Sequence, residues 1–373
     1  RLTRRKTMDI IEEFKELVMI DSASGQERAI ADVLTAKLRA LGFAVTEDRA
    51  GETFGGDTGN LTAVREGDRP GAILFCSHMD RVANGLHIRP REKDGGLVSD
   101  GTTILAADDV SGICAILDGV RRALASRKPL PRLEIAFTVG EESGLWGGRA
   151  LDLSRFQSPF CYVMDSPGTL GRLINGAPGL AKLQAEILGK AAHAGNEPEK
   201  GINAAHILCH ILDTLKDGRL DEETVANFPL MGTGNTATNI VCDRAWVKGE
   251  SRSRNQEKLE AYMDYFQRHC QEAAAGTGAR VRTAAEISFA PFQLAETEPV
   301  IRTAVKALEA LGIAPRIEQG GGGMDANIFN AKGLPSLGVA TGYTKNHTLE
   351  ENLDLESFTR SGQLVEKLIG MVG

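Results

Sequence analysis

Histidines and carboxylates stand together at several points of the sequence where they could bind metal ions or move protons. The first point is His78, two positions before Asp80 and directly after a short apolar run. In an extended segment these two side chains lie on the same side, so the carboxylate can orient the imidazole of a metal-binding histidine. The second point is the pair Glu141 and Glu142, directly after another apolar run. One of them could bind a metal ion while its neighbour acts as the general base on water.

Three further motifs carry the same residue types. Asp108 and Asp109 precede an apolar helical segment, Asp165 ends an apolar run, and His347 lies in a loop near the C-terminus. Each motif also has an ordinary structural explanation, because adjacent aspartates cap helices and a histidine or carboxylate is common in a polar turn. A metal site is therefore indicated only if the fold brings the motifs together.

Alternating strands and helices are the elements that could bring them together. Apolar runs at 72–77, 133–139 and 161–165 predict buried strands, and a helical pattern at 110–124 falls between the first two. This order favours an α/β fold with a doubly wound, mostly parallel sheet and helices on both faces. The acidic motifs then follow the C-terminal ends of separate strands, which meet at one edge of such a sheet.

Carboxylates gathered at one edge of a sheet would repel each other and raise each other's pKa, and cations relieve this repulsion. A ligand set of histidine, aspartate and glutamate without thiolates suits zinc, with manganese or cobalt as alternatives. One carboxylate shared by two ions is the arrangement that two-metal hydrolases use. We therefore expect two Zn²⁺ per chain, or Mn²⁺ or Co²⁺ in their place.

The pattern changes near Gly179, where the order becomes strand, helix, strand, strand, helix, strand. This order is the ferredoxin-like signature. We predict one α/β domain formed by residues 8–178 and 290–373, interrupted by a smaller domain at residues 179–289. The predicted elements of the smaller domain are the segments 180–188, 201–215, 225–232, 239–249, 255–275 and 279–289.

Composition and charge exclude several classes of function. The 373 residues include 43 lysines and arginines against 50 aspartates and glutamates, a formal net charge of −7. Such a chain is a poor general binder of nucleic acid or anionic membrane, and no run of 18 apolar residues indicates a membrane span. Residues 1–7 are basic but lack the apolar segment of a secretory signal, and Met8 resembles a start residue.

The six cysteines are scattered along the chain without a Cys-x-x-Cys pair. Most of them lie in apolar strand-like or helix-like segments, so we interpret them as buried, reduced thiols of a cytoplasmic protein. They are Cys76, Cys114, Cys161, Cys209, Cys242 and Cys270.

The order of these motifs resembles the di-zinc exopeptidase family that contains peptidase T, aminoacylase, carboxypeptidase G and succinyl-diaminopimelate desuccinylase. The likeness runs over residues 10–368, and three stretches are most similar to the peptidase T-like branch: SDGTTILAADD at 99–109, GKAAHAGNEPEKGINA at 189–204 and GGGMDANIFNAKGLPS at 321–336. The resemblance implies that residues 8–178 and 290–373 form the catalytic domain. It also implies that residues 179–289 form a lid and the dimerisation domain of a homodimer.

The resemblance also implies roles for the acidic motifs. Asp80 would orient a metal-binding histidine, Glu141 would be the general base, and Asp108 would bridge the two metal ions. The Asp108–Asp109 peptide bond is typically cis in such enzymes, a geometry that is rare without proline. The implied metal ligands are His78, Asp108, Glu142, Asp165 and His347.

Further residues match positions that contact the substrate in this family. His193 would stabilise the oxyanion, often from the partner subunit, and Arg252 would bind a substrate carboxylate. Without the resemblance, His193 would be interpreted as an exposed loop residue and Arg252 as a surface arginine. Asn239 matches a polar substrate-contacting position, and Gly322 and Gly323 permit close approach of the backbone to substrate.

Two positions depart from the peptidase T-like pattern. Val110 stands where a lysine usually follows the paired aspartates, and Gln319 stands where true tripeptidases carry arginine. The second departure puts strict tripeptide specificity in doubt. We therefore expect a metal-dependent exopeptidase, an aminopeptidase on short peptides. The alternatives are an N-acyl amino acid amidase or carboxypeptidase on the same scaffold, or an inactive binding protein. An intact set of predicted ligands argues against the last of these.

Overall fold

The computed structural model describes residues 9–372, so the basic segment 1–7 and Met8 lie outside the described residues. The described chain forms two compact units. The first contains residues 9–176, 293–320 and 324–372, and the second contains residues 177–292 and 321–323. Each unit is described separately below.

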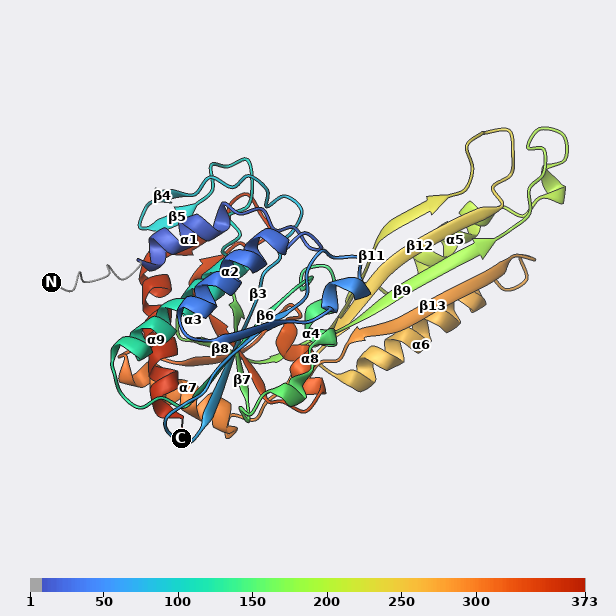
Figure 1. Ribbon diagram of the computed structural model, residues 1–373. Helices are drawn as coiled ribbons and strands as arrows, with labels where there is room; N and C mark the ends of the chain where they lie inside the picture. Colours follow the sequence, from blue (N-terminus) through green and yellow to red (C-terminus); the bar gives the residue numbers. More distant parts are fainter. Residues whose placement is uncertain (1–8, 373) are drawn as a thin grey trace. The chain divides into compact units, whose positions relative to one another are not determined.

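A mostly parallel sheet lies at the centre of the first unit (Figure 1). Its order is β1, β2, β6, β3, β7, β16, β8, and β15 pairs with β8. β6, β3, β7 and β16 are mutually parallel, whereas β1 and β2 pair antiparallel with their neighbours. β8 pairs antiparallel with β16 and parallel with β15. The strands are β1 (Ala44–Glu47), β2 (Leu61–Arg65), β3 (Ala72–His78), β6 (Arg132–Thr138), β7 (Cys161–Ser166), β8 (Arg172–Ala177), β15 (Arg316–Gln319) and β16 (Ser336–Ala340). The predicted α/β fold class is therefore confirmed.

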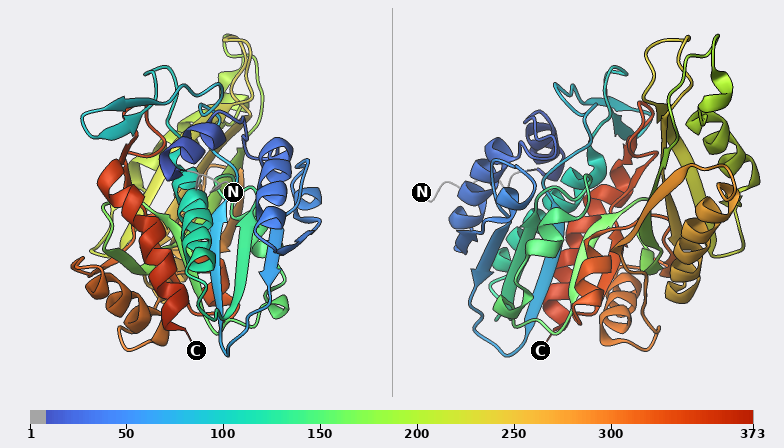
Figure 2. Two further views of the ribbon diagram at one scale, coloured as in Figure 1. Left: turned by 60° about the vertical axis from the view of Figure 1, so that its left-hand side comes forward. Right: turned by 90° about the vertical axis from the view of Figure 1, so that its right-hand side faces the viewer.

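Helices cover both faces of this sheet, as the fully buried strands β3, β7 and β16 require (Figure 2). α3 packs on β3 and β7, and α1 and α9 pack against α3. α8 packs on β7 and β16. Neighbouring residues of β3 show that these are opposite faces, because Ser77 contacts Asp109 of α3 while Cys76 contacts Asp325 of α8. The helices of the unit are α1 (Ile10–Val18), α2 (Arg28–Ala40), α3 (Ala107–Ala125), α4 (Trp146–Ala150), α7 (Pro299–Ala310), α8 (Asp325–Ala331) and α9 (Leu355–Met371), with 3-10 turns η1 (Ala50–Thr53) and η2 (Leu153–Arg155).

A small antiparallel sheet holds the loop that carries His347. Its order is β17, β18, β5, β4. The strands are β4 (Arg91–Lys93), β5 (Gly96–Val98), β17 (Tyr343–Thr344) and β18 (Asn352–Asp354). The loop between β17 and β18 is therefore anchored at both ends. One more short strand, β14 (Phe292–Gln293), lies at the sequence boundary between the two units.

The second unit has the predicted order of strands and helices. Its sheet runs β10, β11, β12, β9, β13, with antiparallel pairing throughout. The last four strands have the neighbour relations of a ferredoxin-like fold. The elements are β9 (Gly179–Leu188), η3 (Pro198–Lys200), α5 (Ala204–Thr214), β10 (Gly218–Arg219), β11 (Thr224–Thr233), β12 (Arg244–Ser253), α6 (Gln256–Ala273) and β13 (Arg280–Phe289). β12 begins later than the predicted segment 239–249, because residues 239–241 pair instead with the loop around His193.

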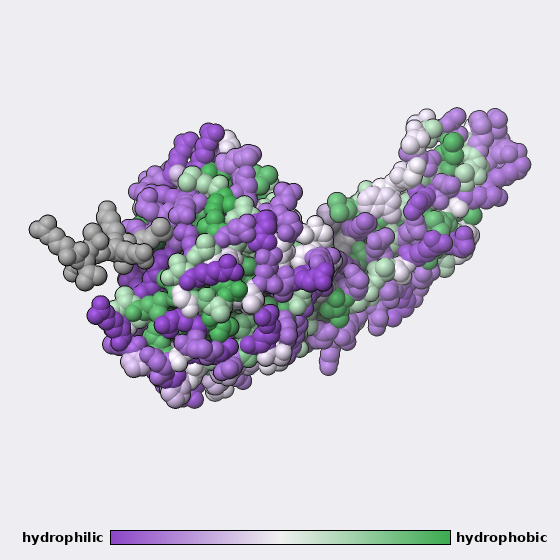
Figure 3. Space-filling model, in the orientation of Figure 1, coloured by the Kyte–Doolittle hydropathy of each residue, from purple (hydrophilic) through white to green (hydrophobic). Residues whose placement is uncertain are grey.

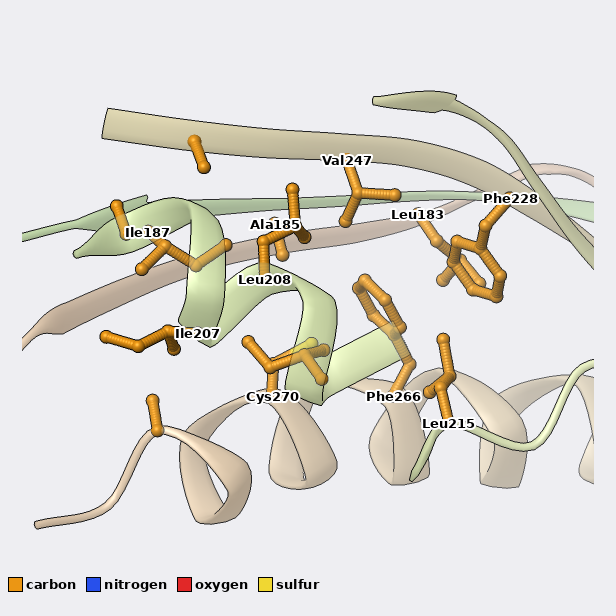
Figure 4. Close-up of a cluster of buried hydrophobic side chains, with 14 of the residues drawn as sticks. Leu183, Ala185, Ile187, Ile207, Leu208, Leu215, Phe228, Val247, Phe266 and Cys270 are labelled. Carbon is orange, nitrogen blue, oxygen red and sulfur yellow. The ribbon is translucent and has the colours of Figure 1, made fainter. Parts of the chain in front are cut away.

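The core of the second unit lies between its sheet and two helices (Figure 4). Phe266 of α6 stacks on Phe228 of β11, with ring centroids 5.3 Å apart. Val247 of β12 and Leu208 of α5 lie in the same buried cluster. Alternate residues of β9 are buried, as expected for a strand with one face on a core and the other in water.

Two local features of the sequence give wrong predictions. The spacing of Ser24 and Glu27 predicts a capping box at the start of α2, but neither side chain caps this helix. Their side chains bind Asp80 and the N–H of Gly140 instead. Cys209 is exposed on α5, whereas the other five cysteines are buried free thiols. Cys209 lies outside the apolar stripe of the helix, which contains Ile207, Leu208 and Ile211.

Hydrophilic residues dominate the visible surface of the described chain (Figure 3). Among the described residues, no helix is long and apolar enough to cross a membrane.

Candidate active site

His78 is the last residue of β3, and its imidazole lies beside three aspartates. Its Nε2 atom lies 3.1 Å from Oδ1 of Asp108 and 3.9 Å from Oδ1 of Asp165. Its Nδ1 atom lies 2.9 Å from the backbone oxygen of Asp80 and 3.4 Å from a carboxylate oxygen of the same residue. Nδ1 is therefore the nitrogen held by the protein, and Nε2 faces the other carboxylates. The backbone of Asp80 is the nearer partner, although the sequence suggested its carboxylate.

Asp108 lies between two histidines. One of its carboxylate oxygens faces His78, and the other lies 3.2 Å from Nε2 of His347. Asn346 also donates to that second oxygen, over 2.7 Å. The Asp108–Asp109 peptide bond is cis, as predicted, and Ala106 just before it has left-handed backbone angles. Each oxygen of the Asp108 carboxylate therefore faces a different imidazole.

Glu141 and Glu142 follow β6 in a turn whose backbone is held by two other carboxylates. Asp80 accepts the N–H groups of Glu141 and Glu142, over 2.9 and 3.2 Å. Glu27 accepts the N–H of Gly140 over 3.0 Å. Ser24 donates its hydroxyl to Asp80. Three consecutive N–H groups of the turn are thus paired with acids.

Asp165 lies near the end of β7, within reach of the same cluster. Tyr343 donates its hydroxyl to Oδ1 of Asp165 over 2.9 Å. Glu142 lies on the other side of the cluster, where one of its oxygens is 2.9 Å from Nε2 of His347. The structure therefore brings together all seven residues that the sequence placed at strand ends or in the C-terminal loop: His78, Asp80, Asp108, Glu141, Glu142, Asp165 and His347.

Three carboxylates of this cluster hold protons more tightly than ordinary ones. Burial raises the pKa of Glu141 and of Asp165 well above their usual values, and burial also raises the pKa of Glu142. Burial by itself would lower the pKa of His78, but contacts with Asp108 and Asp80 outweigh it, and the pKa is well raised. A cluster with so many buried acids is stabilised by cations, which can replace these protons.

The donor atoms fit divalent metal ions. They form three overlapping groups, in each of which the ligand atoms lie within 4.8 Å of one another. His78, Asp108 and Glu142 each belong to two of the groups. Nitrogen and oxygen donors without sulfur suit zinc, manganese or cobalt. The groups are His78, Asp108 and Asp165; His78, Glu141 and Glu142; and Asp108, Glu142 and His347.

His193 and Asn239 lie side by side in the second unit. The segment around His193 pairs with residues 239–241, and the N–H of Ala194 donates to the backbone oxygen of Asn239 over 2.9 Å. Both residues are exposed. Nδ1 of His193 accepts the N–H groups of Gly195 and Asn196, over 3.1 and 3.2 Å. The neutral imidazole must therefore carry its proton on Nε2, which leaves an outward-facing donor.

Arg252, on β12 of the second unit, is half-buried and pairs with a neighbouring acid. Its Nε atom lies 2.8 Å from an oxygen of Glu250, and both line a shallow depression. Position 323 has room only for glycine, because a Cβ there would lie 2.2 Å from the ring of Phe289. Gly322 faces open space. Close packing, rather than approach of substrate, is thus a sufficient reason for Gly323.

Sequence reasoning missed several residues that hold the cluster in place. Tyr343 and Asn346 closely precede His347 in the sequence, so their proximity to a proposed ligand was the available signal. Ser24 and Glu27 offered no such signal, because their spacing is typical of a helix cap. Glu351, a buried residue four positions after His347, also went unnoticed.

Comparison with known protein families agrees with this geometry. Residues 175–278 match the peptidase dimerisation domain of the M20 peptidases, and residues 60–165 match peptidase family M28. The match to the dimerisation domain covers most of the second unit. The match to family M28 ends at Asp165 and includes four of the five predicted metal ligands.

Relatives cover nearly the whole chain. Uncharacterized protein YqjE of Bacillus subtilis is 38% identical over 361 residues, which is 96% of this chain and 97% of that protein. The crystal structure of aminopeptidase PepT from Bacillus cereus is 38% identical, with a TM-score of 0.88, and covers 96% of this chain and 97% of its own. A tripeptidase from Staphylococcus aureus is 33% identical, with a TM-score of 0.91, and covers 96% of both chains.

Fold, donor cluster and family matches define one class of protein, a metallopeptidase that hydrolyses peptide bonds. Identity above 30% over nearly the full length narrows this class. The chain belongs to the peptidase T-like branch of the M20 family, as its motifs indicated.

Proposed function

We propose that this chain cleaves short peptides with two metal ions held by His78, Asp108, Glu142, Asp165 and His347. It is a metal-dependent aminopeptidase, an activity supported by its similarity to peptidase T and to a tripeptidase. The observation that carries the two-metal assignment is the position of Asp108, whose two oxygens face His78 and His347 at 3.1 and 3.2 Å. Each imidazole would then bind one ion, and both ions would share the carboxylate of Asp108.

Zinc is the proposed metal, with Mn²⁺ or Co²⁺ as alternatives, because nitrogen and oxygen donors fill the site. Such ions, when bound, polarise a peptide carbonyl and make water more acidic. Asp165 would complete the site of His78, and Glu142 would complete the site of His347. Support comes from their distances to the respective imidazoles, 3.9 Å and 2.9 Å.

Glu141 is the proposed general base. It lies beside the ligand atoms of His78 and Glu142, yet its own carboxylate has no hydrogen-bond donor among the described contacts of the cluster. Burial raises its pKa, which makes the carboxylate a stronger base at neutral pH. It would take a proton from water and pass it to the leaving amine.

Residues of the second unit are proposed to bind the substrate. His193 would donate from Nε2 to the developing oxyanion, since its Nδ1 is already occupied as an acceptor. Arg252 would bind a substrate carboxylate, with Asn239 as a further polar contact. Gly322, which faces open space, could lie against the peptide backbone.

We assign the second unit, which the sequence placed at 179–289, to dimerisation and to a lid over the catalytic domain. The match to a peptidase dimerisation domain supports this assignment. A homodimer in which His193 serves the partner's site follows from the family resemblance. We also propose a cytoplasmic location, because the buried free thiols suit a reducing compartment.

Metal content and hydrolysis, measured together on wild type and on Glu141→Gln, test this proposal. We expect about two zinc ions per chain in both proteins and, in the variant, a fall in kcat of about 10²- to 10⁴-fold. The substrates are a free tripeptide, the same peptide acetylated at its N-terminus, and N-acyl amino acids.

The substrate panel separates the alternatives. Cleavage of the free tripeptide with loss of activity on the acetylated form supports an aminopeptidase. Cleavage of N-acyl amino acids alone would replace the proposal with an amidase. Absence of both bound metal and hydrolysis after reconstitution with Zn²⁺ would leave an inactive binding protein on this fold.

A further inference from the structure

Glu351 is a buried acid in the loop that carries His347, and it is neither a proposed metal ligand nor a proposed catalytic residue. Its residue is 1% exposed, whereas its neighbour Glu350 is exposed and pairs with Lys345 at the surface. The N–H of Glu351 donates to the backbone oxygen of Thr348 over 3.1 Å. Glu351 is therefore part of the same turn that carries His347.

The Glu351 carboxylate accepts three backbone N–H groups from a distant loop. One oxygen accepts the N–H of Leu105 and of Ala106, each over 2.9 Å, and the other accepts the N–H of Asp108 over 3.1 Å. All three donors lie just before or within the start of α3. One side chain thus links the loop of His347 to the backbone of Asp108.

This loop needs an external acceptor because its own geometry provides none. Ala106 has left-handed backbone angles, and Asp108 has non-helical angles inside the first turn of α3. The N–H groups of Leu105, Ala106 and Asp108 lie before or in the first turn of α3, where no carbonyl of the helix can accept them. Buried N–H groups without partners are costly, so the carboxylate that pairs with all three determines where this backbone lies.

We infer that Glu351 is a positioning residue that ties the backbone of Asp108 to the His347 loop and thereby sets the separation of these two side chains. The inference rests on the proposed two-metal function and adds a residue to it. Glu351 belongs to none of the three groups of candidate metal ligands. Its effect passes through Asp108, whose carboxylate lies 3.2 Å from His347.

The chemistry of the contacts makes glutamine a sharp probe. All three partners are N–H donors, and both carboxylate oxygens are used. A glutamine in this place would turn its NH₂ group toward at least one of these donors, whichever way its amide is oriented. Glu351→Gln should therefore disturb the loop although it preserves the size of the side chain. Glu350→Gln is the matched control, because it makes the same change at an exposed neighbour.

Cobalt binding is the main measurement. Co²⁺ is titrated into metal-free wild type, Glu351→Gln and Glu350→Gln, and its visible absorption spectrum reports the ligand geometry. We expect an apparent Kd about 10- to 100-fold higher for Glu351→Gln, with an altered spectrum, and wild-type behaviour for Glu350→Gln. An unchanged Kd and spectrum in Glu351→Gln would overturn the inference.

A second substitution separates positioning from stability. Ala106→Gly removes the cost of the left-handed backbone at residue 106, so it should raise the Tm of Glu351→Gln. Cobalt affinity and spectrum should stay impaired in this double variant, because the two loops are still not tied together. Recovery of affinity and spectrum along with Tm would reduce Glu351 to a merely structural role.

Hydrogen exchange of the wild-type protein provides a test that does not depend on any variant folding. The amides of Leu105, Ala106 and Asp108 should be protected in the metal-free protein, because the carboxylate already holds them. Free exchange that becomes slow only after Co²⁺ is added would show that the ions order the loop, against the inference. Failure of wild type to bind metal or cleave peptides would instead reject the proposed function, whatever the exchange shows.

Discussion

The Nε2 atom of His347 lies 2.9 Å from a carboxylate oxygen of Glu142, although 205 positions separate them in the sequence. One comes from the loop between two strands of the small sheet, the other from the turn after β6. The same Nε2 atom lies 3.2 Å from a carboxylate oxygen of Asp108, so the imidazole of His347 lies between two acids.

This contact predicts how the metal-free protein responds to pH. Hydrogen bonds to Asp108 and Glu142 raise the pKa of His347 from 6.5 to about 10. A raised pKa means that the protonated imidazole stabilises the fold. This contribution is complete below the unfolded-state pKa of 6.5 and disappears as the pH rises through about 10. With chelator present, the Tm of wild type should therefore fall more steeply between neutral pH and about pH 10 than the Tm of His347→Asn. Parallel curves for the two proteins would contradict the prediction.

The acids that hold the catalytic turn predict a graded effect at Glu27. One oxygen of Glu27 accepts the N–H of Gly140, and the other has no hydrogen-bond partner. Glu27→Gln can keep the acceptor and place its NH₂ group at the unpaired position, so activity should stay near wild type. Glu27→Ala leaves the N–H of Gly140 unpaired and the turn of Glu141 loose, which should lower kcat about tenfold or more. Steady-state kinetics of both variants decide this, and equal losses in the two would argue for a role of the charge instead.

The proposed role of His193 predicts that two inactive variants can restore each other. Glu141→Gln lacks the base, and His193→Asn lacks the oxyanion donor but keeps an acceptor near the position of Nδ1. In a hybrid dimer, the subunit with an intact Glu141 could receive an intact His193 from its partner. Co-expression in equal amounts should therefore recover about a quarter of wild-type activity, since half the dimers are hybrids with one competent site each. The control is Glu141→Gln with the double variant, which should stay inactive. A mixture of the two single variants with no recovered activity would place His193 in its own subunit's site or outside the reaction.

Arg252 predicts a dependence on the charge of the peptide's C-terminus. Loss of a charged hydrogen bond to a carboxylate should raise KM about 10- to 100-fold for a free tripeptide in Arg252→Ala. The same peptide with an amidated C-terminus should show little change, because it offers no carboxylate. Arg254→Ala is the matched control, since Arg254 is two positions away and donates to the backbone oxygen of Glu222. Equal KM increases for both peptides would remove the proposed carboxylate contact.

The sequence by itself determined the types of element and the ends of the strands. Runs such as 72–77 and 133–139 are mainly apolar and are followed by polar motifs, so they predicted β3 and β6 with a histidine or glutamates at their C-terminal ends. The order of elements predicted the second fold in the same way. These signals are local, because periodicity and apolar runs reflect which side chains one element buries.

Only the tertiary structure decided the partners of the donor residues. Ser24 and Glu27 have the spacing of a helix cap, yet they bind Asp80 and Gly140, which lie far away in the sequence. Likewise, Glu351 could not be distinguished from Glu350 by residue type, although one is buried against the Asp108 loop and the other lies in water. Hydrogen bonds between distant loops depend on how packed elements place those loops in space, and spacing along the chain carries no record of that placement.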